Sequence, residues 1–283
     1  MKRKLILVLV ILLGIGALAY PTVSNYLAVK HGSQAVQAYE DKVAELSEAD
    51  INAALAAAEQ YNQSLTGQPV HDPFLEGTGM AMTEDYWQML RLGQSMGYLD
   101  IPKIGLLVPI YHGTSDSVLQ KGVGHLEGST LPIGGSSRHT VLTGHTGLTH
   151  AKLFTDLIEL VEGDQFYIRV LNQVLAYEVG QIKVIEPQDT QELMRFEGKD
   201  YATLLTCTPY GVNSHRLLVR GERVEYLPEV HDNIEQINGS AIDKLVFTAA
   251  VVTATAMGVL IGIVMVVKRR RKKQRAASGG VET

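Results

Sequence analysis

The chain has only one cysteine among its 283 residues, Cys207, so it contains no internal disulfide bond. It also lacks internal repeats, low-complexity segments, a glycine-rich phosphate loop ahead of a helix, and any His/Cys cluster with the spacing of metal ligands. These absences argue against a nucleotide or metal site, and nothing in the sequence requires a cofactor. The lone thiol is then either a small buried hydrophobic group or a reactive one.

Both ends of the chain carry an apolar run beside basic residues. At the N-terminus, three basic residues at positions 2 to 4 precede an uncharged stretch from Leu5 to Ala19, which is the layout of a secretory signal. The uncharged stretch continues to Ala28, so it is also long enough for a membrane span. Residues 1–30 are therefore predicted to be either a signal peptide or an N-terminal membrane anchor.

The C-terminal run is longer. The stretch from Leu245 to Val267 is uncharged and mostly apolar, which predicts a transmembrane helix over 245–267. Seven basic residues follow, as in a cytoplasmic stop-transfer tail over 268–283, and the polar residues 229–244 suit a tether. These flanks predict a protein of the cell membrane, with its C-terminal tail in the cytoplasm and its middle region outside.

The middle region is acidic. Of the 25 Lys and Arg residues, three lie at positions 2 to 4 and seven in the C-terminal tail, which leaves 15. Of the 30 Asp and Glu residues, only Glu282 lies in the tail, which leaves 29 and a formal charge near −14. A surface of this sign makes nucleic acid an unsuitable partner.

The segment after the first apolar run is predicted to be helical. Apolar residues recur every three or four positions from Ser33 to Leu65, which indicates a helical segment over 31–66 that serves as a plain stalk. Ser47 with Asp50 has the pattern of a helix cap, so we expect two helices with a break near Ser47. Glycine, two prolines and the loss of periodicity then predict an exposed loop over 67–83.

Residues 84–228 are predicted to form a mainly β domain, closed so that its strand edges are hidden. Short runs rich in β-branched and aromatic residues alternate there with glycine, proline or asparagine. The predicted helices of this region are Lys152 to Leu160 and Gln191 to Phe196. The predicted strands are Tyr98–Ile101, Leu106–Tyr111, His139–Leu142, Gln165–Leu171, Val174–Ile185, Ala202–Thr206 and Arg216–Glu225.

The stretch TLLTCTPYGVNSHR, from Thr203 to Arg216, surrounds the single cysteine. Cys207 ends a strand-like run, a turn-rich segment over 209–213 follows, and the next strand-like run begins at Arg216. A strand, a loop and a returning strand would bring Arg216 beside Cys207. One thiol and one guanidinium would then share a face.

This stretch resembles the sortases, the membrane-bound cysteine transpeptidases of Gram-positive bacteria. TLLTC matches their TLxTC signature, and Arg216 matches their essential arginine. The resemblance runs from about Gly97 to Tyr226, and the continuation TPYGVNSHRLLVRGER is most similar to class C, the pilin-polymerising branch. It implies an eight-stranded β-barrel. Further matching motifs are IPKI at 101–104, PIYHG at 109–113, LPIGG at 131–135 and TGH at 143–145.

The resemblance implies a catalytic set of Cys207, His145 and Arg216. The Cys207 thiolate would hold the acyl half of a substrate as a thioester. His145 would protonate the departing amine and later take a proton from the incoming one. Arg216 would donate to the oxyanion of the tetrahedral intermediate. Class C members often have arginine where this chain has Thr146, a departure outside the catalytic set.

Other residues compete for these roles. His215 neighbours Arg216 and should point to the opposite face of its strand. Arg220 lies an even number of residues after Arg216, so both side chains lie on the same face of the strand and Arg220 is a second candidate for the oxyanion donor. The family pattern favours Arg216. The remaining histidines outside the loop are expected in linkers or as structural residues: His31, His112, His125, His139, His150 and His231.

The loop contains Asp72-Pro73-Phe74, which resembles the lid motif of class C sortases. The resemblance implies that Asp72 pairs with Arg216 and that the Phe74 ring covers Cys207, so that the loop imitates a bound substrate. Taken alone, such a triplet in a loop is simply a turn.

The expected function is that of a class C sortase. It would cleave an LPxTG-like sorting signal between Thr and Gly and pass the acyl group to a lysine amine of a pilin subunit. Its partners would be pilin subunits and the membrane, with no nucleic acid and no cofactor. The alternatives are a housekeeping sortase that uses a cell-wall precursor, and a non-catalytic, membrane-anchored β-domain that binds peptides. The C-terminal span and the lid argue against the first, and the complete catalytic set against the second.

Overall fold

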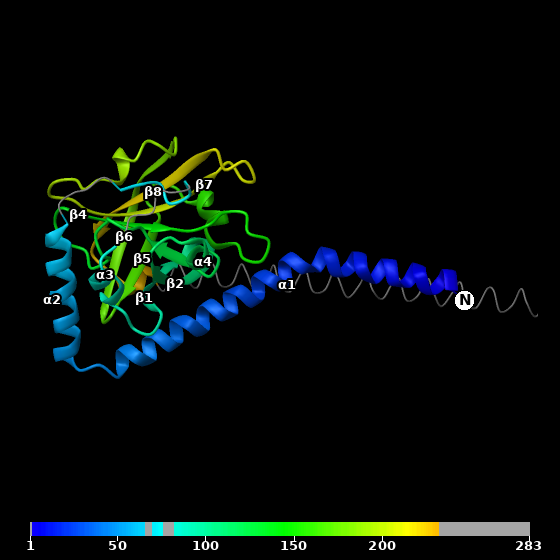
Figure 1. Ribbon diagram of the computed structural model, residues 1–283, viewed down its shortest axis with the longest axis horizontal. Helices are drawn as coiled ribbons and strands as arrows, with labels where there is room; N and C mark the ends of the chain where they lie inside the picture. Colours follow the sequence, from blue (N-terminus) through cyan, green and yellow to red (C-terminus); the bar gives the residue numbers. More distant parts are fainter. Residues whose placement is uncertain (1, 66–69, 76–81, 232–283) are drawn as a thin grey trace, which may run out of the picture. The chain divides into compact units, whose positions relative to one another are not determined.

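The computed structural model describes residues 2–65, 70–75 and 82–231 (Figure 1). Within these ranges, no helix combines the length and the apolar character needed to cross a bilayer. The predicted transmembrane helix over 245–267 and the basic tail over 268–283 lie outside the described residues. So does the predicted tether beyond residue 231.

The N-terminal region forms two helices, α1 (Lys2–Ala44) and α2 (Glu48–Ser64). The predicted break near Ser47 is confirmed, because Ser47 caps α2. The Ser47 hydroxyl accepts a hydrogen bond from the Asp50 backbone N–H at 3.2 Å, and the Asp50 carboxylate accepts one from the Ser47 N–H at 3.3 Å. The periodic apolar pattern predicts helix only from Ser33, whereas α1 already begins at Lys2.

Both helices pack on the β domain and are not a plain stalk. Val36 and Tyr39 of α1 form a buried cluster with Tyr98 of the first strand. Asn62 of α2 is fully buried, and its side-chain oxygen accepts a hydrogen bond from the Leu131 backbone N–H at 2.7 Å. Because a buried amide without a partner is costly, this bond fixes α2 against the domain.

Eight strands close into a barrel in the order β1-β2-β3-β4-β7-β8-β6-β5, which confirms the predicted closed β-barrel. β3 has only three residues and was not predicted. The short helices are α3 (Glu84–Gln88), α4 (Asp116–Leu119), η1 (Pro102–Ile104), η2 (Leu153–Glu159) and η3 (Gln191–Leu193). The strands are β1 (Ser95–Ile101), β2 (Leu106–His112), β3 (Val123–His125), β4 (Arg138–Thr143), β5 (Gln165–Val170), β6 (Gln173–Ile185), β7 (Asp200–Thr208) and β8 (His215–Val224).

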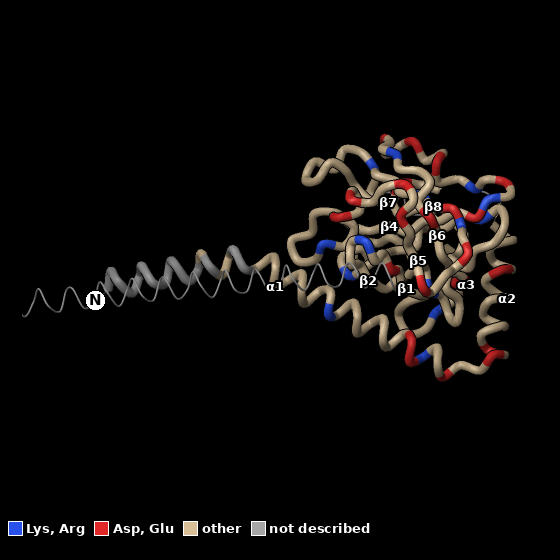
Figure 2. The backbone as a smooth tube through the Cα atoms, turned by 180° about the vertical axis from the view of Figure 1, so that it is seen from behind, with Lys and Arg blue, Asp and Glu red and all other residues tan. Residues whose placement is uncertain are grey.

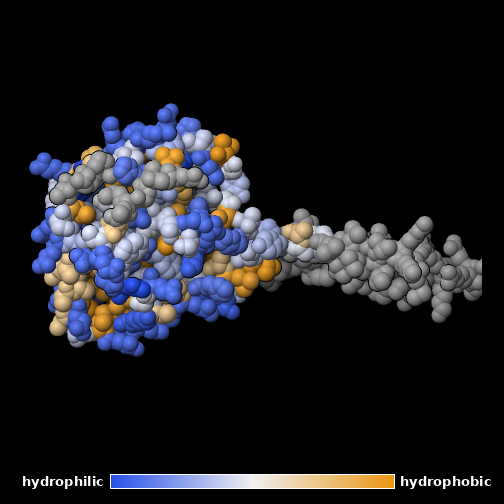
Figure 3. Space-filling model, in the orientation of Figure 1, coloured by the Kyte–Doolittle hydropathy of each residue, from blue (hydrophilic) through white to orange (hydrophobic). Residues whose placement is uncertain are grey.

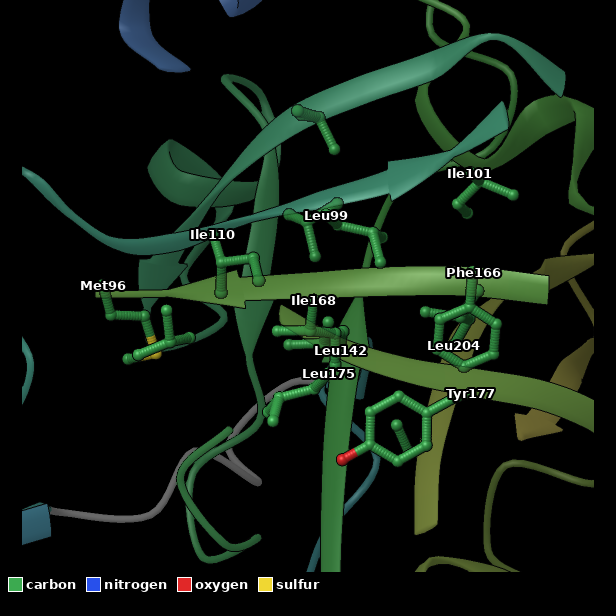
Figure 4. Packing of buried hydrophobic residues seen from close by; sticks show 14 of the residues in the cluster. Met96, Leu99, Ile101, Ile110, Leu142, Phe166, Ile168, Leu175, Tyr177 and Leu204 are labelled. Atoms are coloured by element: carbon green, nitrogen blue, oxygen red, sulfur yellow. The ribbon is translucent and has the colours of Figure 1, made fainter. Parts of the chain in front are cut away.

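Alternate residues of the strands build two separate apolar clusters. Leu142 of β4 and Leu204 of β7 belong to the core inside the barrel (Figure 4). Their neighbours Val141 and Leu205, together with Leu218 of β8, belong to a second cluster on the outer side of the same strands. This separation follows from the two-residue period of a strand, and it leaves an apolar outer face on β4, β7 and β8.

The surface carries charges of both signs. Asp and Glu residues are interspersed with Lys and Arg over the barrel, and several acidic residues lie on α2 (Figure 2). The face shown in Figure 3 is mainly hydrophilic over the barrel, with small separate hydrophobic groups.

Candidate active site

Three adjacent strands bring His145, Cys207 and Arg216 into one row. β7 lies between β4 and β8, and the register pairs Cys207 with Arg216. On the other side, Thr143 pairs with Leu205 in a parallel ladder. His145 and Cys207 each follow that pair by two residues, so both lie at the same level of the barrel.

Hydrogen bonds continue this ladder as far as the residue before His145. The Gly144 backbone N–H donates to the Leu205 carbonyl at 3.1 Å, and the Thr206 hydroxyl donates to the Gly144 carbonyl at 2.7 Å. The His145 carbonyl in turn accepts a hydrogen bond from the Phe154 N–H at 3.1 Å. The backbone on both sides of the imidazole is therefore fixed to β7 and η2.

Strand alternation also sets the direction of these side chains. Cys207 is two residues from Leu205, and Arg216 is two residues from Leu218, so both share the outer apolar face of those leucines. Cys207 is a free cysteine with only 9% of its surface exposed. The prediction that thiol and guanidinium share a face is confirmed.

The loop segment over 70–75 covers this row. Asp72 and Arg216 form a bidentate ion pair, in which Arg216 Nε donates to Oδ2 at 2.6 Å and Nη2 donates to Oδ1 at 3.0 Å. Their side chains are only 2% and 4% exposed. Arg216 also donates to the Asn213 carbonyl at 3.1 Å, so the β7–β8 loop supports its guanidinium from the other side.

The Phe74 ring lies between the two ends of the row. Its centroid is 5.5 Å from that of the His145 ring, and Arg216 Cζ lies 5.2 Å from it, within the range of a cation–π contact. Val70 is buried in the outer apolar cluster, against which Phe74 also packs. Val70, Asp72 and Phe74 are alternate residues of one segment. Val70 was not predicted from the sequence as part of this site, although its spacing of two from Asp72 was a signal for it.

The closed segment holds the thiol in its neutral form. Burial raises the pKa of Cys207 to about 11, against the lowering effect of the Arg216 guanidinium, and the Asp72 carboxylate raises it further. The ion pair with Asp72 therefore offsets the influence by which Arg216 would favour the thiolate.

His145 is also held neutral. Burial lowers the pKa of His145, while the nearby Asp116 carboxylate raises it. Asp116 Oδ1 lies 3.7 Å from His145 Nε2, which suits an ion pair if the ring is protonated but is too long for a hydrogen bond. Asp116 was not predicted as a site residue, because a carboxylate in a short unpredicted helix belongs to no sequence motif.

The competing candidates lie elsewhere. His215 is exposed, and its ring Nδ1 shares a hydrogen bond with Ser214, whereas Arg216 is buried. Arg220 instead pairs with Glu192 at 3.1 Å, and its guanidinium lies 4.8 Å from the ring centroids of two aromatic residues. The sequence predicted that Arg220 shares the strand face of Arg216, but these contacts separate it from the row.

Most of the other histidines have structural partners. His139 is fully buried, with Nδ1 2.7 Å from the Met194 carbonyl and Nε2 2.7 Å from the Thr203 hydroxyl. His231 was expected in a linker. It is instead buried, with Nε2 2.7 Å from a carboxylate oxygen of Asp100.

A cavity of about 240 Å³ opens beside the closed segment. Val70 lines it together with the loop that connects β6 and β7, including Leu193 and Met194. No group of three or more His, Cys, Asp or Glu side chains within the described ranges is arranged to hold a metal ion.

Comparison with known proteins gives a consistent match. Residues 99–224 match the model of the sortase domain. The chain is 33% identical over 135 residues to sortase D of Bacillus subtilis, an alignment that covers 47% of this chain and 65% of that protein. The chain thus spans just under two thirds of that relative's length.

Solved structures extend the similarity. Sortase C-1 from Streptococcus pneumoniae is 47% identical, with a TM-score of 0.66 over 69% of this chain and 100% of that one. A pilus-related sortase C of Group B Streptococcus is 46% identical, with a TM-score of 0.64 over 68% of this chain and 97% of that one.

Proposed function

This chain belongs to the sortase family, and we propose that it is a class C sortase, a cysteine transpeptidase that joins pilin subunits. Its substrate would be an LPxTG-like sorting signal, cleaved between Thr and Gly, and its acceptor a lysine amine of another pilin subunit. The observation that carries this proposal is the row of His145, Cys207 and Arg216 across β4, β7 and β8.

In the first step, the Cys207 thiolate attacks the threonine carbonyl carbon and forms a tetrahedral intermediate. The Arg216 guanidinium donates to its oxyanion, an effect worth about 3–4 kcal/mol for a single donor in other enzymes. The imidazolium of His145 gives its proton to the glycine nitrogen as the C–N bond breaks. A thioester on Cys207 and a neutral His145 remain.

In the second step, the lysine ammonium gives one proton to neutral His145, and the resulting amine attacks the thioester carbonyl and releases its second proton to solvent. The C–S bond breaks, Cys207 leaves as a thiolate, and an isopeptide bond joins the two pilin subunits. The pair of thiolate and imidazolium is then restored. Splitting one amide exchange into two acyl transfers in this way is the usual gain of nucleophilic catalysis.

The lid must leave for either step to occur. While Asp72 binds Arg216, the guanidinium is not available to an oxyanion, and the raised pKa of Cys207 keeps the nucleophile protonated. An LPxTG-like peptide would take the outer apolar face on which Val70 and Phe74 now pack. We therefore assign the segment containing Asp72 and Phe74 as a lid that imitates the substrate.

The proposed setting is the outer face of the cell membrane of a Gram-positive bacterium. The predicted C-terminal span and the tether before it would keep the active site near the bilayer. Its partners would then be pilin subunits attached to the same membrane, and the reaction needs no cofactor.

The test is to trap the thioester. The full chain with Asp72→Ala and Phe74→Ala is incubated with an LPxTG-type peptide, and its intact mass is measured beside the same chain with Cys207→Ala. The proposal predicts a mass gain equal to the peptide portion that ends at threonine, and none in the Cys207→Ala control. The same gain in both chains, or no gain with a panel of LPxTG-type peptides, would contradict it.

A further inference from the structure

Asp116 lies at the edge of the row, beside the imidazole. It is the first residue of α4, and its Oδ1 is 3.7 Å from His145 Nε2. The side chain of Asp116 is 82% exposed, whereas that of His145 is only 22% exposed. His145 Nε2 is itself buried and has no hydrogen-bond partner among the described residues. The exposed Asp116 carboxylate therefore lies next to an imidazole nitrogen that is itself buried from solvent.

Asp116 is also free of cations, unlike the other carboxylate of the site. Asp72 is held by the Arg216 guanidinium in a buried bidentate pair. Among the described residues, Asp116 forms no ion pair with a lysine or arginine, and its Oδ1 accepts only a long hydrogen bond from Gln120 Nε2 at 3.4 Å. An exposed, uncompensated negative charge next to the proposed general base is therefore ready to receive a cation.

The second step of the proposed reaction brings a cation to this place. A lysine side chain has a pKa of about 10.4, so the acceptor arrives as an ammonium group and must lose a proton before it can attack. A carboxylate near the base can bind that ammonium and orient it toward the imidazole. The sorting signal needs no such group, because its scissile amide is uncharged.

We propose that Asp116 is a positioning residue for the acceptor, which binds the ammonium group of the incoming lysine and directs it to His145. This inference rests on the proposed transpeptidase function. The ammonium gives one proton to neutral His145, and the resulting amine attacks the thioester carbonyl. The new amide nitrogen releases a second proton to solvent as the C–S bond breaks, which restores the thiolate and the imidazolium.

The test compares two nucleophiles on the same thioester. Both chains carry Asp72→Ala and Phe74→Ala in the full-length protein, and one also carries Asp116→Asn. Each is acylated with an LPxTG-type peptide and then offered either an Nα-acetylated lysine peptide, which is cationic near neutral pH, or hydroxylamine, which is uncharged there. The ratio of the two aminolysis rates is measured, so that any change in acylation cancels.

Asp116→Asn should lower the ratio of lysine to hydroxylamine transfer about two- to fivefold, the range that one charge pair at a protein surface supplies. The lysine reaction should show this as a higher KM for the amine. Asp116→Glu should restore most of the ratio. The control Glu45→Gln removes an exposed carboxylate in the turn between α1 and α2, away from β7 and β8 in Figure 1, and should leave the ratio unchanged.

An unchanged ratio would overturn the inference in either of two ways. If both rates fall equally, Asp116 acts only through the imidazole, and if neither rate falls, Asp116 has no part in the transfer. If the parent chain forms no thioester, the proposed function fails together with this inference. If the thioester forms and only the ratio is unaffected, the proposed function stands and this inference alone falls.

Discussion

Removing the charge of Asp72 should release the lid and activate the thiol. In the closed state, Asp72 and Arg216 form a buried bidentate ion pair at 2.6 and 3.0 Å. Asp72→Asn leaves the guanidinium without its counterion, and the loss of one partner from a buried pair typically costs about 3–5 kcal/mol. When the segment that carries residue 72 leaves the site, the Arg216 guanidinium becomes hydrated and the penalty is relieved. We therefore expect Asp72→Asn to open the lid and not to unfold the barrel.

The expected effect on Cys207 follows from its pKa, which is raised to about 11 in the closed state. At pH ~8, such a thiol is roughly 0.1% ionised, whereas an exposed cysteine with a pKa near 8.5 is roughly one quarter ionised. The thiolate fraction thus rises about 200-fold. A less basic thiolate is intrinsically a weaker nucleophile, by about tenfold here, so the net gain is about 20-fold before any gain in access.

The assay is the rate of alkylation by iodoacetamide, followed by intact mass. Because Cys207 is the single cysteine, each added group reports on this site alone. Asp72→Asn should react at least tenfold faster than the parent chain, while Asp41→Asn, on the exposed side of α1, should not differ from the parent. Rates for Asp72→Asn within twofold of the parent would refute the lid account.

Three further predictions concern residues that stabilise β4 and the packing of α2 on the barrel. In Gly144→Ala, the new Cβ would lie 2.8 Å from the buried Phe154 ring, so activity should fall sharply and the free energy of unfolding by about 1–3 kcal/mol. Asn62→Ala leaves the buried Leu131 N–H without its partner and should cost about 1–3 kcal/mol in urea unfolding. Burial lowers the pKa of His139 to about 4, so its neutral form contributes stability above pH ~6.5 that is lost as the pH falls, about 3 kcal/mol by pH ~4.

Each prediction has a matched comparison. A Cβ at Gly180 meets nothing within 4 Å, so Gly180→Ala should leave activity unchanged, and equal effects at Gly144 and Gly180 would contradict the packing argument. Asn52 is exposed on α2, and Asn52→Ala should cost less than about 0.5 kcal/mol. His139→Gln should lose less stability than the parent between pH ~6.5 and ~4, and an identical pH dependence would exclude the histidine as a source of acid sensitivity.

The sequence predicted the closed β-barrel and the pairing of Cys207 with Arg216, because both depend on local patterns. Strand-like runs separated by turn residues predict a closed sheet, and one short loop between two strands places the cysteine and the arginine on paired positions. The break at Ser47 was predictable for the same reason, since a capping box is a signal within four residues. The ion pair of Asp72 with Arg216 spans 144 positions, and only the family resemblance indicated it.

Other features depend on contacts that no local pattern contains. The three residues of β3 are too few to show a strand period, and α4 is a single turn, so Asp116 carried no signal of its position beside His145. The tether prediction placed His231 in a linker, but its imidazole bonds Asp100 across 131 positions. α1 and α2 carried a clear helical period, but nothing in that period showed that Tyr39 and Asn62 would be buried against the barrel.

The most direct test of the central claim is complete acyl transfer between two peptides. The full chain with Asp72→Ala and Phe74→Ala is mixed with an LPxTG-type peptide and a lysine-containing peptide from a pilin, and the products are identified by mass spectrometry. The account predicts an isopeptide between the threonine carboxyl and the lysine Nζ, with equal release of the fragment that begins at glycine, and neither product with Cys207→Ala. An isopeptide that still forms with Cys207→Ala, or cleavage that yields only free threonine ends at high lysine concentration, would contradict it.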